Sequence, residues 1–159
     1  MSALALAELC YRTLLADGAD ALRAAERKEM TPALERIIEA NILLSGLGFE
    51  SAGLAAAHAV HNSLTEVPGS HAFLHGEKVA FGVLVQLMLE KAEPKQVKEV
   101  LGFCRSVGLP TTLAEIGCGD LSQEMLSKVA IRATLPGEWM KNEPFPVDAE
   151  MVKLSLIHI

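Results

Sequence analysis

Residues 76–92 read GEKVAFGVLVQLMLEKA, and this stretch decides the fold class. Its apolar residues stand almost all round a helix instead of on one face; they are Val79, Ala80, Phe81, Val83, Leu84, Val85, Leu87, Met88 and Leu89. A helix that is apolar on nearly every side is usually buried in the middle of a bundle. We therefore expect a helix over 76–92 with other helices packed around it.

The chain on both sides of this stretch also carries helical patterns with start and stop signals. We expect helices over 3–17, 19–28, 31–46, 51–64, 94–108 and 121–135, and a last one that begins at Asp148. The helix at Thr31 has a good N-cap, and Pro32 occupies its first turn. Strand signals are poor, because no sustained alternation or hairpin turn is present. The sequence predicts a single all-α, multi-helix domain.

The composition indicates apolar surface in excess of one small core. Half of the 159 residues are hydrophobic, and the mean hydropathy is +0.29. No apolar run approaches the roughly 20 residues that cross a bilayer, so we expect no membrane association. The excess instead predicts a buried partner, either another domain or another subunit. The net charge of −6, without a Lys/Arg cluster, offers no surface for nucleic acid.

The three cysteines and the two chain ends bear on location and completeness. Cys10, Cys104 and Cys118 form no CxxC unit, which favours a reduced, cytoplasmic setting, and we expect Cys10 and Cys104 in the core. The start, MSALALAELC, lacks the basic region of a secretory signal. Both ends look cut, because the chain begins inside a helical pattern and stops at LSLIHI. We expect residues 154–159 to be a short tail foreign to the domain.

Four of the five histidines fall within eighteen residues. His58 and His61 share a helix face at i,i+3 spacing. A turn-rich connection then leads to His75 at the start of the buried helix, an arrangement that could bring His58 and His75 together. Imidazole pairs suit Zn²⁺ or Fe²⁺. The alternative is that these are core histidines among small residues that allow tight helix packing. His71 is expected in a surface turn, and His158 carries no weight.

Two histidines are too few for a catalytic zinc site, which generally takes three protein ligands. The nearest acids in the sequence are Glu66 and Glu77, and neither has an evident geometric advantage. The third ligand is therefore expected elsewhere in the chain or outside it.

Residues 31–90, TPALERIIEANILLSGLGFESAGLAAAHAVHNSLTEVPGSHAFLHGEKVAFGVLVQLMLE, resemble the C-terminal domain of the bacterial glycerol dehydrogenases, in the iron-containing alcohol dehydrogenase superfamily. ALALAELCYRTLL and VGLPTTLAEIG fit as well, so the resemblance covers about residues 3–153. It implies that residues 1–153 are the helical, metal-binding domain of a homo-oligomeric enzyme. It also implies that His58 of AAAHAVHN and His75 of LHGEKVAFG bind zinc. The family's third ligand, an aspartate, and its Gly-rich NAD-binding segment have no counterpart in this chain.

The resemblance implies an NAD-linked oxidation of glycerol to dihydroxyacetone, with zinc as the Lewis acid and nicotinamide as the hydride acceptor. His61 is a candidate for supporting a ligand or relaying a proton, and its alternative is a plain helix-face residue. The chain alone is expected to be inactive. Two other functions stay open: a non-catalytic helical packing or oligomerisation module, and the same enzyme class acting on another short diol or alcohol.

Overall fold

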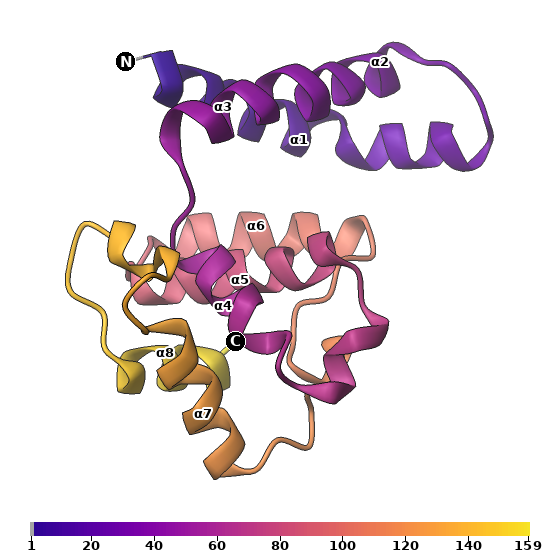
Figure 1. The fold of residues 1–159 in the computed structure, drawn as a ribbon. Coiled ribbons are helices and arrows are strands. Elements are labelled where there is room, and N and C mark those ends of the chain that lie inside the picture. The colour runs from indigo at the N-terminus through magenta and orange to yellow at the C-terminus, as the bar shows by residue number, and fades with distance from the viewer. Residues whose placement is uncertain (1) are drawn as a thin grey trace. The chain divides into compact units, whose positions relative to one another are not determined.

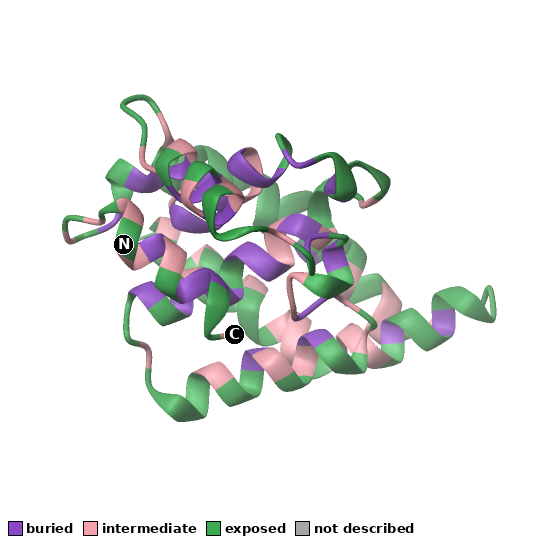
Figure 2. Cartoon of the chain, turned by 90° about the horizontal axis from the view of Figure 1, so that it is seen from below, coloured by how far each residue is buried: buried purple, intermediate pink, exposed green. Residues whose placement is uncertain are grey.

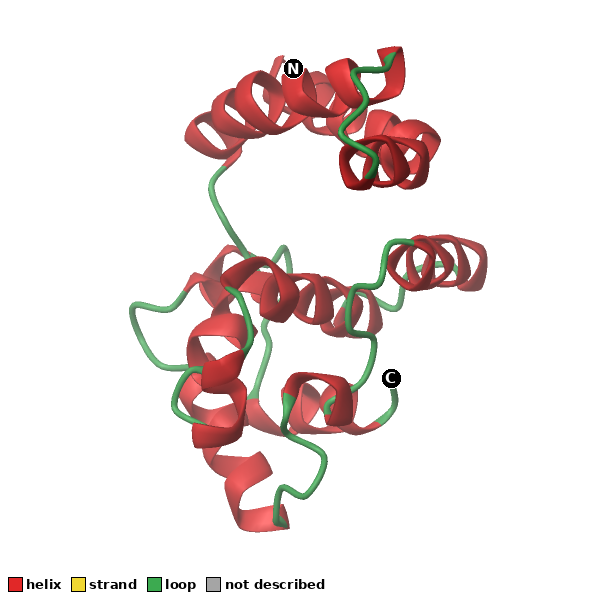
Figure 3. Ribbon diagram, turned by 90° about the vertical axis from the view of Figure 1, so that its right-hand side faces the viewer, coloured by secondary structure: helices red, strands yellow, loops and turns green. Residues whose placement is uncertain are grey.

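The computed structural model describes residues 2–159, and these form helices and loops with no strand among them (Figure 3). The chain divides into two compact units, one ending at Gly53 and one spanning Leu54–Ile159. The first unit holds α1 (Ser2–Glu26), α2 (Pro32–Glu39), a π-helical segment (Ala40–Leu44) and α3 (Ser45–Ala52) (Figure 1). The second holds α4 (Ala56–Leu64), α5 (His75–Leu89), α6 (Pro94–Ser106), α7 (Gln123–Ala133) and α8 (Ala149–Ile157). The expected all-α class is confirmed.

The first helix is longer than its sequence pattern predicts. We expected a break at Asp17 and Gly18, but α1 continues through both residues to Glu26. Asp17 does not interrupt the helix, because its carboxylate accepts two hydrogen bonds, of 2.7 and 2.6 Å, from Arg36 on α2. A glycine inside a helix costs only about 1 kcal/mol relative to alanine. The prediction of two helices here is wrong.

The boundary between the next helices also lies elsewhere than expected. Thr31 caps α2 as predicted, since its hydroxyl accepts the N–H of Leu34 at 3.3 Å. Helical structure then runs on through the π-helical segment to Ala52, beyond the expected end near residue 46. The break falls at Gly53, where φ is +77°, a value that glycine adopts readily. The expected helix over 51–64 is therefore divided, and only its second half forms α4.

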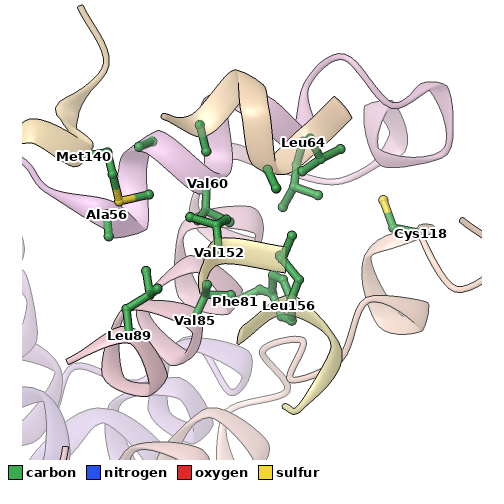
Figure 4. Close-up of a cluster of buried hydrophobic side chains, with 14 of the residues drawn as sticks. Ala56, Val60, Leu64, Phe81, Val85, Leu89, Cys118, Met140, Val152 and Leu156 are labelled. Carbon is green, nitrogen blue, oxygen red and sulfur yellow. The ribbon is translucent and has the colours of Figure 1, made fainter. Parts of the chain in front are cut away.

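The core of the second unit surrounds α5, as the apolar stretch predicts. Helix α5 contacts α4, α6 and α8. Buried side chains from α4, α5, α7 and α8, with Met140 of the 3₁₀ turn Trp139–Asn142, meet in one cluster (Figure 4), which includes Ala56, Val60, Leu64, Phe81, Val85, Leu89, Val129, Met140, Val152 and Leu156. Val100 and Cys104 of α6 pack against Leu84 and Leu87 of α5 in a second, smaller cluster. Most buried residues in the described part of the chain belong to this unit. Figure 2 shows how burial is distributed over the ribbon. The larger cluster holds α4 against α5.

Helices α7 and α8 begin at side-chain caps, of which the one at Asp148 was predicted. The hydroxyl of Ser122 accepts the N–H of Met125 at the start of α7, and the carboxylate of Asp148 accepts the N–H of Met151 at the start of α8. Residues 154–157 continue α8, and Leu156 is buried in the core. Cys104 and Cys118 are buried, whereas Cys10, also expected in the core, is half-buried and donates a weak hydrogen bond to the carbonyl of Ala40.

The first unit leaves many large apolar side chains exposed, as the composition suggested. They are Leu4, Leu9, Tyr11, Leu22, Met30, Ile38, Ile42, Leu43, Leu47 and Phe49. An apolar surface of this extent is typical of a protein that packs against a partner. Within residues 2–159 no single helix is long and apolar enough to cross a membrane. The bent pair Pro32–Ala52 and Ala56–Leu64 meets the criteria of length and composition only when its two parts are taken together.

Candidate metal centre

Helix α4, which carries His58 and His61, has its first turn held by distant side chains. Its N-cap residue, Ala55, has no side chain that could accept a hydrogen bond. Glu143 instead accepts the N–H of Ala56 at 2.9 Å, and Gln86 accepts the N–H of Ala57 at 3.0 Å. Two of the helix's free N–H groups are thereby satisfied. These bonds fix the start of α4, one or two residues before His58 and a little more than one turn before His61.

The connection from α4 to α5 is held by polar contacts within a short 3₁₀ turn, Pro68–Ala72. The buried hydroxyl of Ser70 donates to the carbonyl of Leu64 at 2.6 Å, and the buried ammonium of Lys78 donates to the carbonyl of Ser70 at 3.3 Å. At the start of α5 the carboxylate of Glu77 accepts the N–H of Leu74 at 2.6 Å. The connection therefore returns the chain to α4 with His75 at the first position of α5.

The result is a cluster of three imidazoles. The ring centroids of His58 and His75 lie 5.6 Å apart, and those of His61 and His75 lie 4.3 Å apart. The Nδ1 atom of His75 is 3.1 Å from the Nε2 atom of His61. His58 and His61 are half-buried and His75 is exposed. The structure thus brings together His58 and His75, as the spacing predicts, and places His61 beside them.

The surroundings favour the neutral form of two of these imidazoles, those of His58 and His61. Burial lowers the pKa of His58, and the neighbouring rings of His75 and His61 lower it further. Burial also lowers the pKa of His61, with His75 and the charge of Lys78 acting in the same direction and a hydrogen bond to Asn62 opposing them. A neutral imidazole offers the lone pair that a metal ion requires. The donor set therefore fits a divalent ion such as zinc.

The same part of the chain does not complete a site. Among residues 2–159, no group of three His, Cys, Asp or Glu side chains is arranged to hold a metal ion. Glu77 is engaged as a cap of α5, and Glu66 pairs with Arg132 at 2.7 Å. His71 is exposed and bonds the carbonyl of Thr65, and His158 bonds that of Leu154. Neither histidine joins the cluster, in agreement with the sequence reading.

Sequence reasoning missed several polar residues around the cluster. Asn62 lies 3.1 Å from the Nδ1 atom of His61 and donates to Glu138 at 2.9 Å. Its position next to His61 in the sequence was the signal that could have drawn attention to it. Glu138 and Glu143 gave no such signal, because their contacts here cross 76 and 87 residues of sequence.

Comparison with known proteins shows which proteins this chain is similar to. The glycerol dehydrogenase of Thermotoga maritima is 57% identical over 156 residues, which are 98% of this chain and 43% of that protein. That of Pseudomonas putida is 52% identical over 159 residues, again 98% of this chain and 43% of that protein. The chain is homologous to the C-terminal part of the glycerol dehydrogenases. It spans less than half the length of these curated relatives. No family model matches the chain.

Solved structures named glycerol dehydrogenase share the fold. A probable glycerol dehydrogenase from Sinorhizobium meliloti superposes with a TM-score of 0.93 at 42% identity, over 98% of this chain and 44% of that one. The glycerol dehydrogenase of Schizosaccharomyces pombe gives a TM-score of 0.93 at 36% identity, over 98% and 40%. The helical arrangement is therefore that of the corresponding part of glycerol dehydrogenases.

Proposed function

We propose that this chain is the zinc-binding, helical part of an NAD-linked glycerol dehydrogenase, with glycerol and dihydroxyacetone as its substrate and product. The observation that carries the proposal is the convergence of His58 and His75, whose ring centroids lie 5.6 Å apart on two neighbouring helices. Homology to glycerol dehydrogenases across 98% of the chain supports it. The family resemblance supplies the identity of the metal and of the cofactor.

In this proposal His58 and His75 hold the metal as neutral imidazoles. When bound, zinc supplies a Lewis acid that polarises the hydroxyl group to be oxidised, and NAD supplies the hydride acceptor. His58 is held in place by α4, whose first turn is pinned by Glu143 and Gln86. His75 is the exposed member of the pair and so faces the space in which a substrate can lie.

The remaining parts of the enzyme lie in sequence that this chain does not contain. The relatives are more than twice as long as the chain, since it covers 43% of them. We place the third zinc ligand, an aspartate, and the NAD-binding domain in that additional sequence. A cytoplasmic location and a homo-oligomeric assembly of the complete enzyme belong to the same proposal. The chain by itself is expected to have no dehydrogenase activity.

Two observations favour alternatives. A relative from Halobacterium salinarum that is 48% identical over 152 residues is named glycolaldehyde reductase, which favours the same enzyme class acting on another short alcohol. The exposed apolar side chains of the first unit favour a packing or oligomerisation module. A comparison of glycerol with ethane-1,2-diol as substrate separates the first alternative from the main proposal.

The proposal is tested by restoring the missing half. The chain is joined to the N-terminal part of the Thermotoga maritima enzyme, and zinc content and NAD-dependent glycerol oxidation are measured. The chimera is expected to bind zinc and oxidise glycerol, and His58→Ala or His75→Ala is expected to remove both. His71→Ala, outside the cluster, is the matched control and should retain both. Full zinc content in a folded His75→Ala chimera would refute the ligand assignment, and a chimera that binds zinc but oxidises no alcohol would favour the packing module.

A further inference from the structure

A line of hydrogen bonds leads from α7 to the imidazole cluster. Arg132 donates to one oxygen of Glu138, and the amide nitrogen of Asn62 donates to the other at 2.9 Å. The Oδ1 atom of Asn62 lies 3.1 Å from Nδ1 of His61, and Nε2 of His61 lies 3.1 Å from Nδ1 of His75. His61 is thus bonded on both of its nitrogens, which a plain helix-face residue would not require.

The direction of these bonds is set at Glu138. A carboxylate only accepts hydrogen bonds. Burial raises the pKa of Glu138, but the hydrogen bonds from Asn62 and Arg132, together with the charge of Arg132, outweigh burial and leave that pKa below its ordinary value. Because the ionised group can only accept, Asn62 must present its NH₂ to Glu138. The carbonyl oxygen of the same amide must then face His61.

The orientation of Asn62 determines the tautomers of the two histidines. The amide oxygen of Asn62 only accepts, so Nδ1 of His61 carries the hydrogen. A neutral imidazole has one N–H, and Nε2 of His61 therefore presents a lone pair. The hydrogen between the rings must then belong to Nδ1 of His75. In a neutral His75 this leaves the lone pair on Nε2, the other nitrogen of the ring.

We propose that Glu138, Asn62 and His61 form a positioning relay, which holds His75 in the tautomer that has its lone pair on Nε2. The hydrogen bond from His75 to His61 also fixes the direction of the ring. Histidines that bind metals commonly donate their second N–H to a neighbouring acceptor, and loss of that acceptor typically costs 10–100-fold in affinity. His61 is this acceptor. Only the link to metal binding rests on the proposed function, because the tautomers follow from the chain's own contacts.

The tautomers are tested in the 159-residue chain without added metal. Long-range ¹H–¹⁵N correlation spectra of ¹⁵N-histidine-labelled protein at about pH 8, where imidazoles are neutral, identify the protonated nitrogen of each ring. We expect Nδ1–H for both His61 and His75. His71 is an internal reference, because its Nε2 bonds the carbonyl of Thr65 at 2.8 Å and must carry the hydrogen. Nε2–H at His61 would overturn the relay whatever the chain's function.

The effect on the metal is tested with Glu138→Gln and a matched control. A glutamine can donate as well as accept, so it no longer forces one orientation on Asn62. We expect mixed tautomers at His61 and His75 and a zinc affinity of the chimera that is lower by about tenfold. The control, Glu66→Gln, removes the other carboxylate bound to Arg132, at 2.7 Å, and leaves the relay untouched. It should change neither measurement.

The outcomes separate the relay from the proposed function. Unchanged zinc affinity in Glu138→Gln, with the tautomers mixed, would show that the relay does not prepare a ligand. Equal loss of affinity in both variants would assign the effect to Arg132 and would also overturn the relay. Correct tautomers in a chimera that binds no zinc would sink the metal assignment and leave the tautomer relay standing.

Discussion

Gly82 of α5 lies so close to Ala57 of α4 that no side chain fits between them. A Cβ atom at Gly82 would stand 2.3 Å from the carbonyl oxygen of Ala57 and 3.0 Å from its carbonyl carbon. Real Cβ atoms do not approach backbone so closely. The contact joins α4 beside His58 to the helix that begins at His75, so it controls the separation of the two proposed ligands.

Gly82→Ala is therefore expected to lower the free energy of unfolding by about 1–3 kcal/mol, as is usual when extra volume enters a well-packed interior. Alanine ordinarily favours a helix over glycine by about 0.5–1 kcal/mol, so the predicted sign is opposite to the intrinsic preference. Gly102→Ala in α6 is the control, because a Cβ there has no neighbour within 4 Å. Urea unfolding of both variants measures the difference. A Gly82→Ala protein as stable as the control would contradict the close contact.

The sequence is most informative where a helix is specified by its own residues. The apolar stretch of α5 predicts its burial, and Thr31, Ser122 and Asp148 each cap the helix that follows them directly. The prediction fails where a distant residue intervenes. Asp17 carries a helix-stop pattern, yet it bonds Arg36, 19 residues away, and α1 continues. A local pattern cannot reveal such a partner.

In the candidate site, too, the features set by neighbouring residues were predictable and those set by distant residues were not. The spacing of His58 and His75, with a turn-rich connection between them, indicated that the two rings could meet, and in the structure their centroids lie 5.6 Å apart. The partners that orient the rings and the helix were not predictable. Glu143 reaches Ala56 across 87 residues, and Glu138 reaches Asn62 across 76. These acids look like ordinary surface residues until the fold brings them to α4.

The buried carboxylate of Glu143 predicts a particular pH dependence of stability. One of its oxygens accepts the N–H of Ala56 at 2.9 Å, and the other is buried with no hydrogen-bond partner in residues 2–159. Burial raises the pKa of Glu143, the hydrogen bond from Ala56 opposes this, and the charge of Glu90 adds to it. The raised pKa means that the folded chain favours the protonated acid. The associated stability is complete below the ordinary glutamate pKa of about 4.3 and is lost as the pH rises through the folded value.

Glu143→Gln is expected to remove the loss of stability that ionisation of the buried Glu143 carboxylate causes as the pH rises. The amide oxygen still accepts the N–H of Ala56, and no charge forms at neutral pH. The free energy of unfolding, measured in urea at several pH values, should fall less steeply with rising pH in the variant than in the parent chain. Glu143→Ala is the matched comparison, and it should be less stable at every pH by about 1–3 kcal/mol because a buried N–H loses its acceptor. Parallel profiles for Glu143→Gln and the parent would contradict the raised pKa.

The carboxylate of Glu115 is expected to give a pH dependence of stability opposite to that of Glu143. Its carboxylate accepts the N–H of Thr111 at 2.6 Å, the hydroxyl of the same residue at 3.1 Å and the N–H of Thr112 at 3.2 Å. These bonds, that from the Thr111 backbone foremost, lower the pKa of Glu115 despite some desolvation. The stabilisation is present above the ordinary pKa of about 4.3 and is lost as the pH falls through the folded value.

Glu115→Gln should accordingly be less stable than the parent at neutral pH, and the difference should shrink in acid as the parent's carboxylate becomes protonated. Thermal unfolding between neutral pH and about pH 3, below the ordinary glutamate pKa, follows both proteins. A difference that stays constant over this range would show that the charge of Glu115 does not matter to its hydrogen bonds.

The three thiols are expected to react in two classes. Cys118 and Cys104 are 1% and 4% exposed, and burial raises the pKa of each, which disfavours the reactive thiolate. Cys10 is half-buried, and burial raises its pKa as well, but its sulfur is the most accessible of the three. A thiol-specific reagent should therefore modify one cysteine in the native chain and the other two only on unfolding.

Cys10→Ser should abolish the reaction of the native chain. Cys104→Ser should leave that reaction unchanged and should lower by one the number of thiols that react in urea. Rapid modification of all three thiols in the native chain would mean that the helices around Cys104 and Cys118 open far more readily than their packing indicates.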